Sequence, residues 1–186
     1  MKLSPRTKLF GIFVLFGLPI VASYLSYYVW KPAGSRVHGE LLAATPLNYV
    51  SLTTLDGMPA GLDQLRGKWV LLQVESGQCD AACANRLYYG RQVRTAQGRH
   101  MERVARAVVI DDDAMISGEL RRANDGALFL RADAALLRQL PASGAPRGCT
   151  YVIDPLGNLV LRYPSSADPQ GMIHDLQRLL SVSQIG

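Results

Sequence analysis

The sequence has few side chains suited to nucleophilic or metal chemistry, with three cysteines and three histidines among 186 residues. It lacks a phosphate-binding glycine loop, a dinucleotide-binding fingerprint and a serine nucleophile elbow, and its cysteines and histidines show no zinc-ligand spacing. These absences argue against phosphoryl-transfer, hydride-transfer and hydrolytic chemistry. The cysteines remain as the most informative residues of the chain.

Charge is also missing from one long segment. Residues 9–30 contain no charged side chain, and as a helix these 22 residues would span ~33 Å, against about 30 Å for the hydrocarbon core of a bilayer. Tyr24, Tyr27, Tyr28 and Trp30 gather at its end, where aromatic rings prefer the headgroup layer. The sequence therefore predicts a transmembrane helix over 9–30, with a cleaved signal peptide as the alternative.

The distribution of basic residues predicts how this helix is oriented. Residues 1–36 contain five basic side chains and no acidic one, and three of the five precede the apolar segment. This bias places residues 1–8 in the cytoplasm and predicts a single pass through the cytoplasmic (inner) membrane, with the rest of the chain in the periplasm. The periplasm permits disulfide chemistry.

The remainder is expected to be a linker, 31–45, followed by one domain, 46–184. Residues 37–186 carry 15 basic and 15 acidic side chains, a balance that does not indicate a nucleic-acid-binding domain. Apolar runs predict strands, and the segments between them predict helices. The expected strands are 49–54, 69–74, 104–110, 127–130, 150–153 and 159–163, and the expected helices are 80–101, 113–122, 132–140 and 170–180. This alternation favours an α/β domain, with a hairpin turn at 154–158.

Cys79 and Cys83 follow the apolar strand expected at 69–74 and a short loop that contains glycine. If both lie at the start of a helix, positions i and i+4 share one face, so the two sulfurs can form a disulfide or bind one ion. The helix N-terminus would also stabilise the thiolate form. This context favours redox or soft-metal chemistry, with an inert structural disulfide and two small buried side chains as the alternatives.

Three consecutive aspartates, Asp111, Asp112 and Asp113, follow another expected strand. A loop and helix start explains them better than a hard-metal site, because acidic side chains cap helices and favour the helix dipole.

Three stretches and the N-terminal anchor resemble the Sco/SenC family of cytochrome oxidase assembly proteins, within the thioredoxin-like superfamily. They are LDQLRGKWVLL at 62–72, Cys-x-x-x-Cys at 79–83 and TYVIDPLGN at 150–158. The resemblance covers about 46–184 and implies a thioredoxin-like domain, in which a central mixed sheet is flanked by helices.

The resemblance also implies a function. Proteins of this family bind copper through two cysteines and a distant histidine, and serve cytochrome c oxidase as copper donors or thiol reductants. Cys79 and Cys83 match the cysteine pair, which implies dithiol exchange, Cu(I) binding and an oxidase subunit as client. The histidine does not carry over, because 143–149 contains none. A non-enzymatic assembly or scaffold protein with a structural Cys79–Cys83 disulfide is the alternative.

Cys149 lies in the segment where that histidine would be expected. A thiol there could complete a three-sulfur Cu(I) site with Cys79 and Cys83, or resolve a mixed disulfide. The alternative is a small buried side chain at the start of a core strand.

Overall fold

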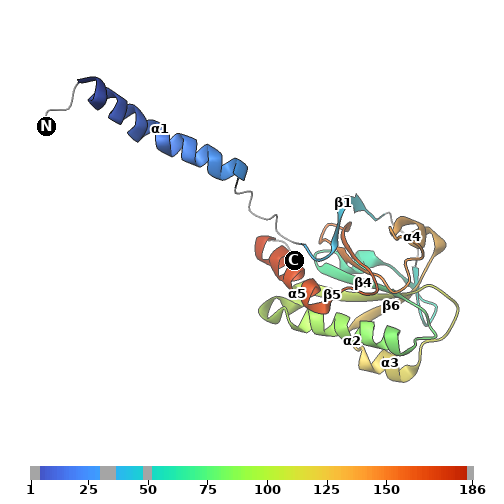
Figure 1. Ribbon diagram of the computed structural model, residues 1–186. Coiled ribbons are helices and arrows are strands. Elements are labelled where there is room, and N and C mark those ends of the chain that lie inside the picture. The colour runs from blue at the N-terminus through green and yellow to red at the C-terminus, as the bar shows by residue number, and fades with distance from the viewer. Residues whose placement is uncertain (1–4, 30–36, 48–51, 184–186) are drawn as a thin grey trace. The chain divides into compact units, whose positions relative to one another are not determined.

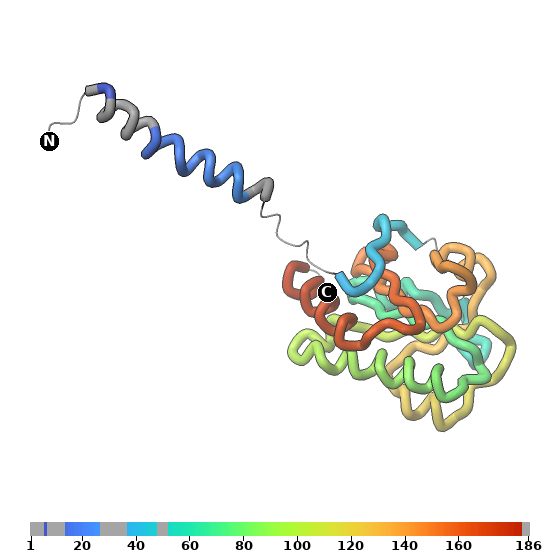
Figure 2. Tube along the Cα trace, viewed as in Figure 1, coloured from blue at the N-terminus to red at the C-terminus, as the bar shows by residue number. Residues whose placement is uncertain are grey.

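The computed structural model describes residues 5–29, 37–47 and 52–183 (Figures 1 and 2). They belong to two units, Met1–Arg36 and Val37–Gly186. The first contains α1, Pro5–Val29. The second contains, in chain order, β1 Glu40–Pro46, β2 Leu52–Thr54, β3 Pro59–Ala60, the 3-10 helix η1 Leu62–Leu65, β4 Trp69–Glu75, α2 Ala81–Thr95, the 3-10 helix η2 Gly98–Arg103, β5 Val104–Ile110, α3 Gly118–Ala123, β6 Ala127–Arg131, α4 Ala134–Gln139, β7 Thr150–Ile153, β8 Asn158–Tyr163 and α5 Pro169–Val182.

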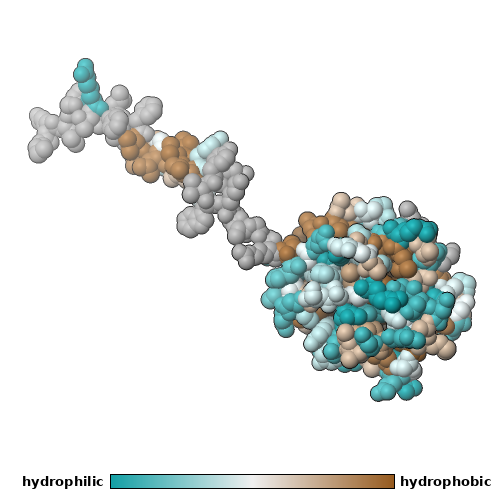
Figure 3. All heavy atoms as spheres, turned by 45° about the vertical axis from the view of Figure 1, so that its right-hand side comes forward, coloured by the Kyte–Doolittle hydropathy of each residue, from teal (hydrophilic) through white to brown (hydrophobic). Residues whose placement is uncertain are grey.

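Helix α1 covers most of the segment predicted to cross a membrane. The described side chains of its central part are mainly apolar and exposed, which Figure 3 shows as a brown surface along the helix. Across the described ranges, no helix combines the length and apolar character that a membrane crossing requires. The anchor at 9–30 therefore stays a prediction, and its last residue, Trp30, lies outside the described residues.

The second unit is built on an eight-stranded mixed sheet in the order β1-β8-β7-β4-β5-β6-β2-β3. Strands β4, β5 and β6 are parallel to one another, while β7 pairs antiparallel with both β4 and β8. Parallel neighbours must be joined by crossovers, and α2 and α3 supply the two that link β4 to β5 and β5 to β6. The α/β fold with a mixed sheet and flanking helices is confirmed.

Helices cover both faces of this sheet (Figure 1). On one face, α2 and α5 pack through Val93, Leu176 and Leu180 against side chains of β4, β5 and β8. On the other face, Leu136 and Leu140, from α4 and the residue that follows it, pack against alternate residues of the same central strands. Because successive side chains of a strand point to opposite faces, β4 contributes to both core layers.

The predicted strands agree closely with the observed ones from β4 onward, and the hairpin turn at 154–158 joins β7 to β8. Two helix predictions were too long. The expected helix 80–101 is α2 followed by η2, and the expected helix 113–122 begins only at Gly118, where Ser117 is the N-cap. Part of the predicted strand 49–54 lies outside the described residues, and β2 covers its end.

The linker prediction for 31–45 requires a correction. Its C-terminal part forms β1, which pairs antiparallel with β8, so the domain begins before residue 46. Figure 2 shows β1 beside β8 although the two are far apart in the sequence. β1 is mostly exposed, with Leu42 packed against the core, and its sequence ELLAATP lacks the alternation of apolar and polar residues that predicts a strand.

A buried carboxylate fixes the chain just before β1. Asp175, on α5, is 5% exposed and accepts hydrogen bonds from the backbone N–H groups of His38 (2.8 Å) and Gly39 (2.9 Å) and from the hydroxyl of Tyr163 (2.9 Å). His38 Nδ1 lies 3.3 Å from the same carboxylate, and its ring stacks on His174. Burial, reinforced by the negative charge of Asp175, raises the pKa of Tyr163 well above its usual range.

We expect Asp175→Ala to lower the free energy of unfolding by on the order of 3 kcal/mol, because it leaves the buried hydroxyl of Tyr163 and two backbone N–H groups without an acceptor. Urea unfolding of the full chain in detergent, followed by circular dichroism, measures this change. The matched control is Glu102→Ala, which removes a carboxylate that is 77% exposed and should change stability by less than about 0.5 kcal/mol. Equal stability of the two variants would show that Asp175 does not hold β1 in place.

Candidate functional site

The candidate site forms where β4 leaves the sheet. Every residue of β4 is buried, because it pairs with β5 on one side and β7 on the other and is covered on both faces. Strands buried in this way are apolar almost throughout. The carboxyl end of β4 therefore holds the next segment, residues 76–80, at a fixed place on one edge of the sheet.

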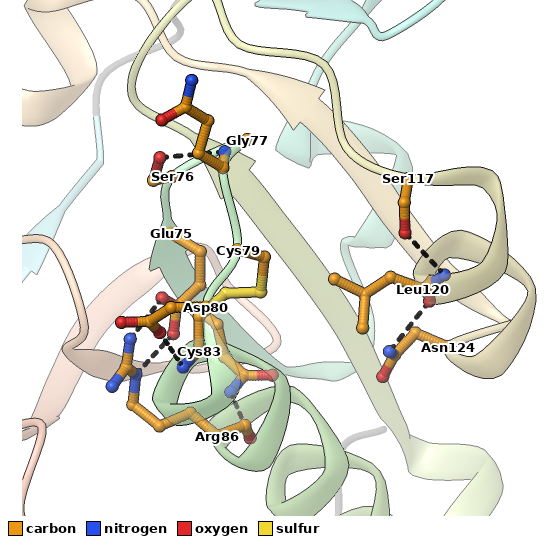
Figure 4. Close-up of a disulfide and its surroundings, with 12 residues drawn as sticks. Glu75, Ser76, Gly77, Cys79, Asp80, Cys83, Arg86, Ser117, Leu120 and Asn124 are labelled. Atoms are coloured by element: carbon orange, nitrogen blue, oxygen red, sulfur yellow. Dashed lines mark hydrogen bonds and ion pairs between the residues drawn. A yellow bond between two sulfur atoms is a disulfide. The ribbon is translucent and has the colours of Figure 1, made fainter.

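Cys79 and Cys83 form a disulfide at this edge, with their Cα atoms 5.2 Å apart (Figure 4). Cys83 is 3% exposed and packs against Leu87, whereas Cys79 is partly exposed. The expectation that the two sulfurs meet is confirmed, but the expected placement of both on one helical face is wrong. Cys79 precedes the helix, and the Cys79 sulfur is the one that solvent and a partner reach more readily.

Asp80 explains why the helix begins only after Cys79. It is the N-cap of α2, and its Oδ1 accepts the backbone N–H of Cys83 at 2.8 Å. This cap occupies an amide that could otherwise face a thiolate, and it adds a negative charge close to both sulfurs. The helix N-terminus therefore favours the thiolate form less than the sequence alone suggests.

A buried ion pair lies next to the disulfide, and Figure 4 shows its two side chains facing each other. Glu75, the last residue of β4, is 1% exposed, and its two carboxylate oxygens accept hydrogen bonds from Nε and Nη2 of Arg86, both at 2.7 Å. Burial raises the pKa of Glu75, while the hydrogen bonds and charge of Arg86 oppose that rise. Because Arg86 lies one turn after Cys83 on α2, this pair ties the cysteine-bearing helix to the end of β4.

Asp112 ties the loop before Cys79 to the loop that follows β5. Its carboxylate accepts hydrogen bonds from the hydroxyl of Ser76 (2.6 Å) and from the backbone N–H groups of Gly77 (2.9 Å) and Ala114 (3.2 Å). The pKa of Asp112 is lowered, chiefly by the hydrogen bond from Ser76. Gly77 packs so closely on Ala114 that a Cβ on Gly77 would overlap the Ala114 carbonyl. The two loops therefore form one connected rim around the disulfide.

Arg147 joins this rim from a third segment, the one that precedes β7. Its guanidinium pairs with Asp111 at 2.8 Å and with Asp112 at 3.2 Å. The aspartates thus serve a loop, as expected, but they do not start a helix. Asp113, the third of the run, is fully exposed and lies 3.5 Å from Arg131.

Cys149 does not join the disulfide, which corrects the predicted three-sulfur site of Cys79, Cys83 and Cys149. Cys149 is 7% exposed and belongs to the core layer of Val74 and Tyr151, on the α4 face of the sheet. The disulfide belongs to the layer on the α2 face. The reason is the register at the start of β7. The backbone carbonyl of Cys149 accepts a hydrogen bond from the N–H of Val74, so the two side chains point to the same face of the sheet. Cys149 is the buried core residue of the alternative interpretation.

The described residues contain no group of three or more histidine, cysteine, aspartate or glutamate side chains placed to hold a metal ion. The two sulfurs of Cys79 and Cys83, once reduced, are the donors that fit a soft ion such as Cu(I). The site can therefore exchange a disulfide, or bind a soft metal in its dithiol form.

Several solved structures of known proteins resemble this chain. No curated protein sequence matches this chain. Among solved structures, apo Sco1 from Thermus thermophilus is 22% identical, with 79% of this chain and 99% of that chain covered and a TM-score of 0.60. Copper-bound yeast Sco1 is 12% identical, with 76% and 96% covered and a TM-score of 0.62. BsSco, described as a member of the Sco family of cytochrome c oxidase assembly proteins with a disulfide switch, is 13% identical, with 77% and 98% covered and a TM-score of 0.56.

These similarities show that the fold is the thioredoxin-like fold that the Sco proteins share. At the level of sequence, residues 69–183 match the model of a family described as transmembrane-like, thioredoxin-like, C-terminal domain. This match covers the cysteine pair, the rim around it and all elements from β4 to α5. The chain therefore belongs to that family.

Proposed function

We propose that this chain is a membrane-anchored, periplasmic Sco-like protein that assists assembly of a copper centre of cytochrome c oxidase by dithiol exchange and Cu(I) binding. The observation that carries the proposal is the Cys79–Cys83 disulfide at the carboxyl end of β4, with Cys79 partly exposed and Cys83 buried. The fold shared with copper-bound Sco1 and with the disulfide switch protein BsSco supports it.

The unequal burial of the two sulfurs assigns their roles in the exchange. In the reduced chain, the Cys79 thiolate attacks a disulfide of the client, forms a mixed disulfide and releases one client thiolate. The Cys83 thiolate then attacks the Cys79 sulfur, which releases the second client thiolate and closes the Cys79–Cys83 disulfide. Two electrons pass to the client, and a partner dithiol must return two electrons to this chain before the next cycle.

The client side of the proposal is a copper-binding cysteine pair on an oxidase subunit, which can accept copper only when its cysteines are reduced. The dithiol form of this chain can reduce such a pair, and the same two thiols can carry Cu(I). The membrane side of the proposal depends on the uncharged segment 9–30 and on the basic residues before it. A tether of this kind would keep the domain near a membrane-embedded client.

We expect Cys79→Ser to abolish reduction of an insulin or copper-site peptide disulfide, because the accessible nucleophile is lost. We expect Cys83→Ser to retain Cys79 and accumulate a mixed disulfide with the peptide, since nothing resolves it. Mass spectrometry under non-reducing conditions measures the adduct.

The matched control for both variants is Cys149→Ser, which removes a thiol on the other face of the sheet and should leave the exchange rate within about 2-fold, provided that the variant remains folded. Full activity of Cys79→Ser would rule out this mechanism. A mixed disulfide that forms through Cys83 in Cys79→Ser would reverse the assigned roles.

The reduction potential separates an exchanging disulfide from a structural one. We expect the Cys79–Cys83 bond to titrate above about −300 mV, because structural disulfides fall below that value. Equilibration of the full chain with dithiol buffers, followed by alkylation and mass analysis, measures this potential. A lower value would favour the scaffold alternative, in which the bond never opens.

A further inference from the structure

One apolar side chain beside the disulfide has no packing role. Met115, in the segment between β5 and α3, is 88% exposed, although exposing a methionine forgoes the free energy gained by burying it. It shares a shallow surface depression with Cys79. The residues that line this depression are Gly77, Gln78, Cys79, Asp80, Met115, Ser117 and Leu120.

The rim described above holds Met115 at this place. Met115 follows Ala114 directly, and Ala114 packs on Gly77, two residues before Cys79. Asp112 accepts hydrogen bonds from both loops, and Arg147 pairs with Asp112 from a third segment. The backbone on both sides of the depression is therefore fixed, while the methionine side chain itself remains free to turn, having three rotatable bonds.

The chemistry of the depression is that of a soft-metal site. Reduction of the disulfide by a dithiol adds two electrons and two protons and leaves two thiols, and Cu(I) then replaces the two thiol protons. Two thiolates alone leave the ion open on one side, and a thioether is a neutral, soft donor that suits Cu(I). Neither Cys149 nor a histidine is placed to fill that position among the described residues.

We propose that Met115 supplies the third ligand to Cu(I) bound by the reduced Cys79–Cys83 pair. This inference rests on the proposed function, since it needs the dithiol form to bind copper. It gives a role to an exposed side chain that has none in packing. It also places the ion on the exposed side of Cys79, where a client can reach it.

The test uses the full chain in detergent, reduced and titrated anaerobically with Cu(I) against a chromophoric chelator. We expect Met115→Leu, which keeps the size and apolar character of the side chain, to weaken Cu(I) binding roughly 10-fold or more, since even indirect supports of a metal site are worth that much. The matched control is Met58→Leu, which changes another exposed methionine (62%) outside the depression and should leave the affinity unchanged.

A spectroscopic measurement observes the ligand directly. In the chain labelled with selenomethionine, X-ray absorption at the copper edge should show a copper–selenium distance that is present in Met58→Leu and absent in Met115→Leu. The control variant Met58→Leu should reduce a peptide disulfide at the normal rate, because Met58 lies outside the depression that contains Cys79.

The outcomes distinguish this inference from the proposed function. Tight Cu(I) binding with equal affinity in Met115→Leu, and no copper–selenium signal, would overturn the role of Met115 and leave the copper function standing. Failure of the unchanged chain to compete for Cu(I) would overturn both. Loss of peptide reduction in Met115→Leu, with unchanged copper affinity, would assign Met115 to client docking instead.

Discussion

The parallel pairing of β4 with β5 is the constraint on which the site depends. Two parallel strands end at the same edge of the sheet, so the loop that carries Cys79 and the loop that carries Asp112 leave side by side. The antiparallel strand β7 begins at that edge as well, which brings Arg147 to the same place. Three segments far apart in the sequence thus meet because of strand direction alone, and hydrogen bonds to Asp112 then fix their spacing.

Charge is the second constraint, and it acts close to the sulfurs. A carboxylate without a partner would be costly at the position of Glu75, and the two hydrogen bonds from Arg86 offset that cost while they hold α2 against the sheet. Asp80 remains as an additional negative charge at the start of the helix. The negative charge of Asp80 makes thiolates less stable here than at a helix N-terminus without such a cap. A bound cation would offset this repulsion.

The sequence predicts the fold well where apolar patterns are strong. Buried strands such as β4 and β5 are largely apolar, and the turn between β7 and β8 contains proline and glycine at permissive positions, so both features can be identified without a structure. β1 could not be found in this way, because it is an exposed edge strand that hydrogen bonds to β8 and Asp175 hold in place. Tertiary contacts define it, and its own residues do not.

Within the site, the cysteine pair was predictable and its surroundings were not. A lone charged residue, Glu75, at the end of an apolar strand is a signal that could have indicated a buried ion pair, since its burial requires a cation. Asp112 follows a strand in a run of acids, but only the structure shows that it accepts hydrogen bonds from the neighbouring loop. The error over Cys149 has a simple origin. The sequence places it near the cysteine pair, whereas the face of a strand on which a side chain lies depends on the register of that strand.

A thioether in place of an imidazole would also change how copper binding depends on pH. An imidazole ligand competes with protons near its ordinary pKa of about 6.5, so a site that uses one loses affinity as the solution becomes mildly acidic. A thioether does not take up a proton in this range. Copper binding by Cys79, Cys83 and Met115 would then depend on pH only through the two thiols, whose protons the metal must displace. The affinity of such a site would rise with pH without a separate step near pH 6.5, which makes the pH profile a signature of the ligand set.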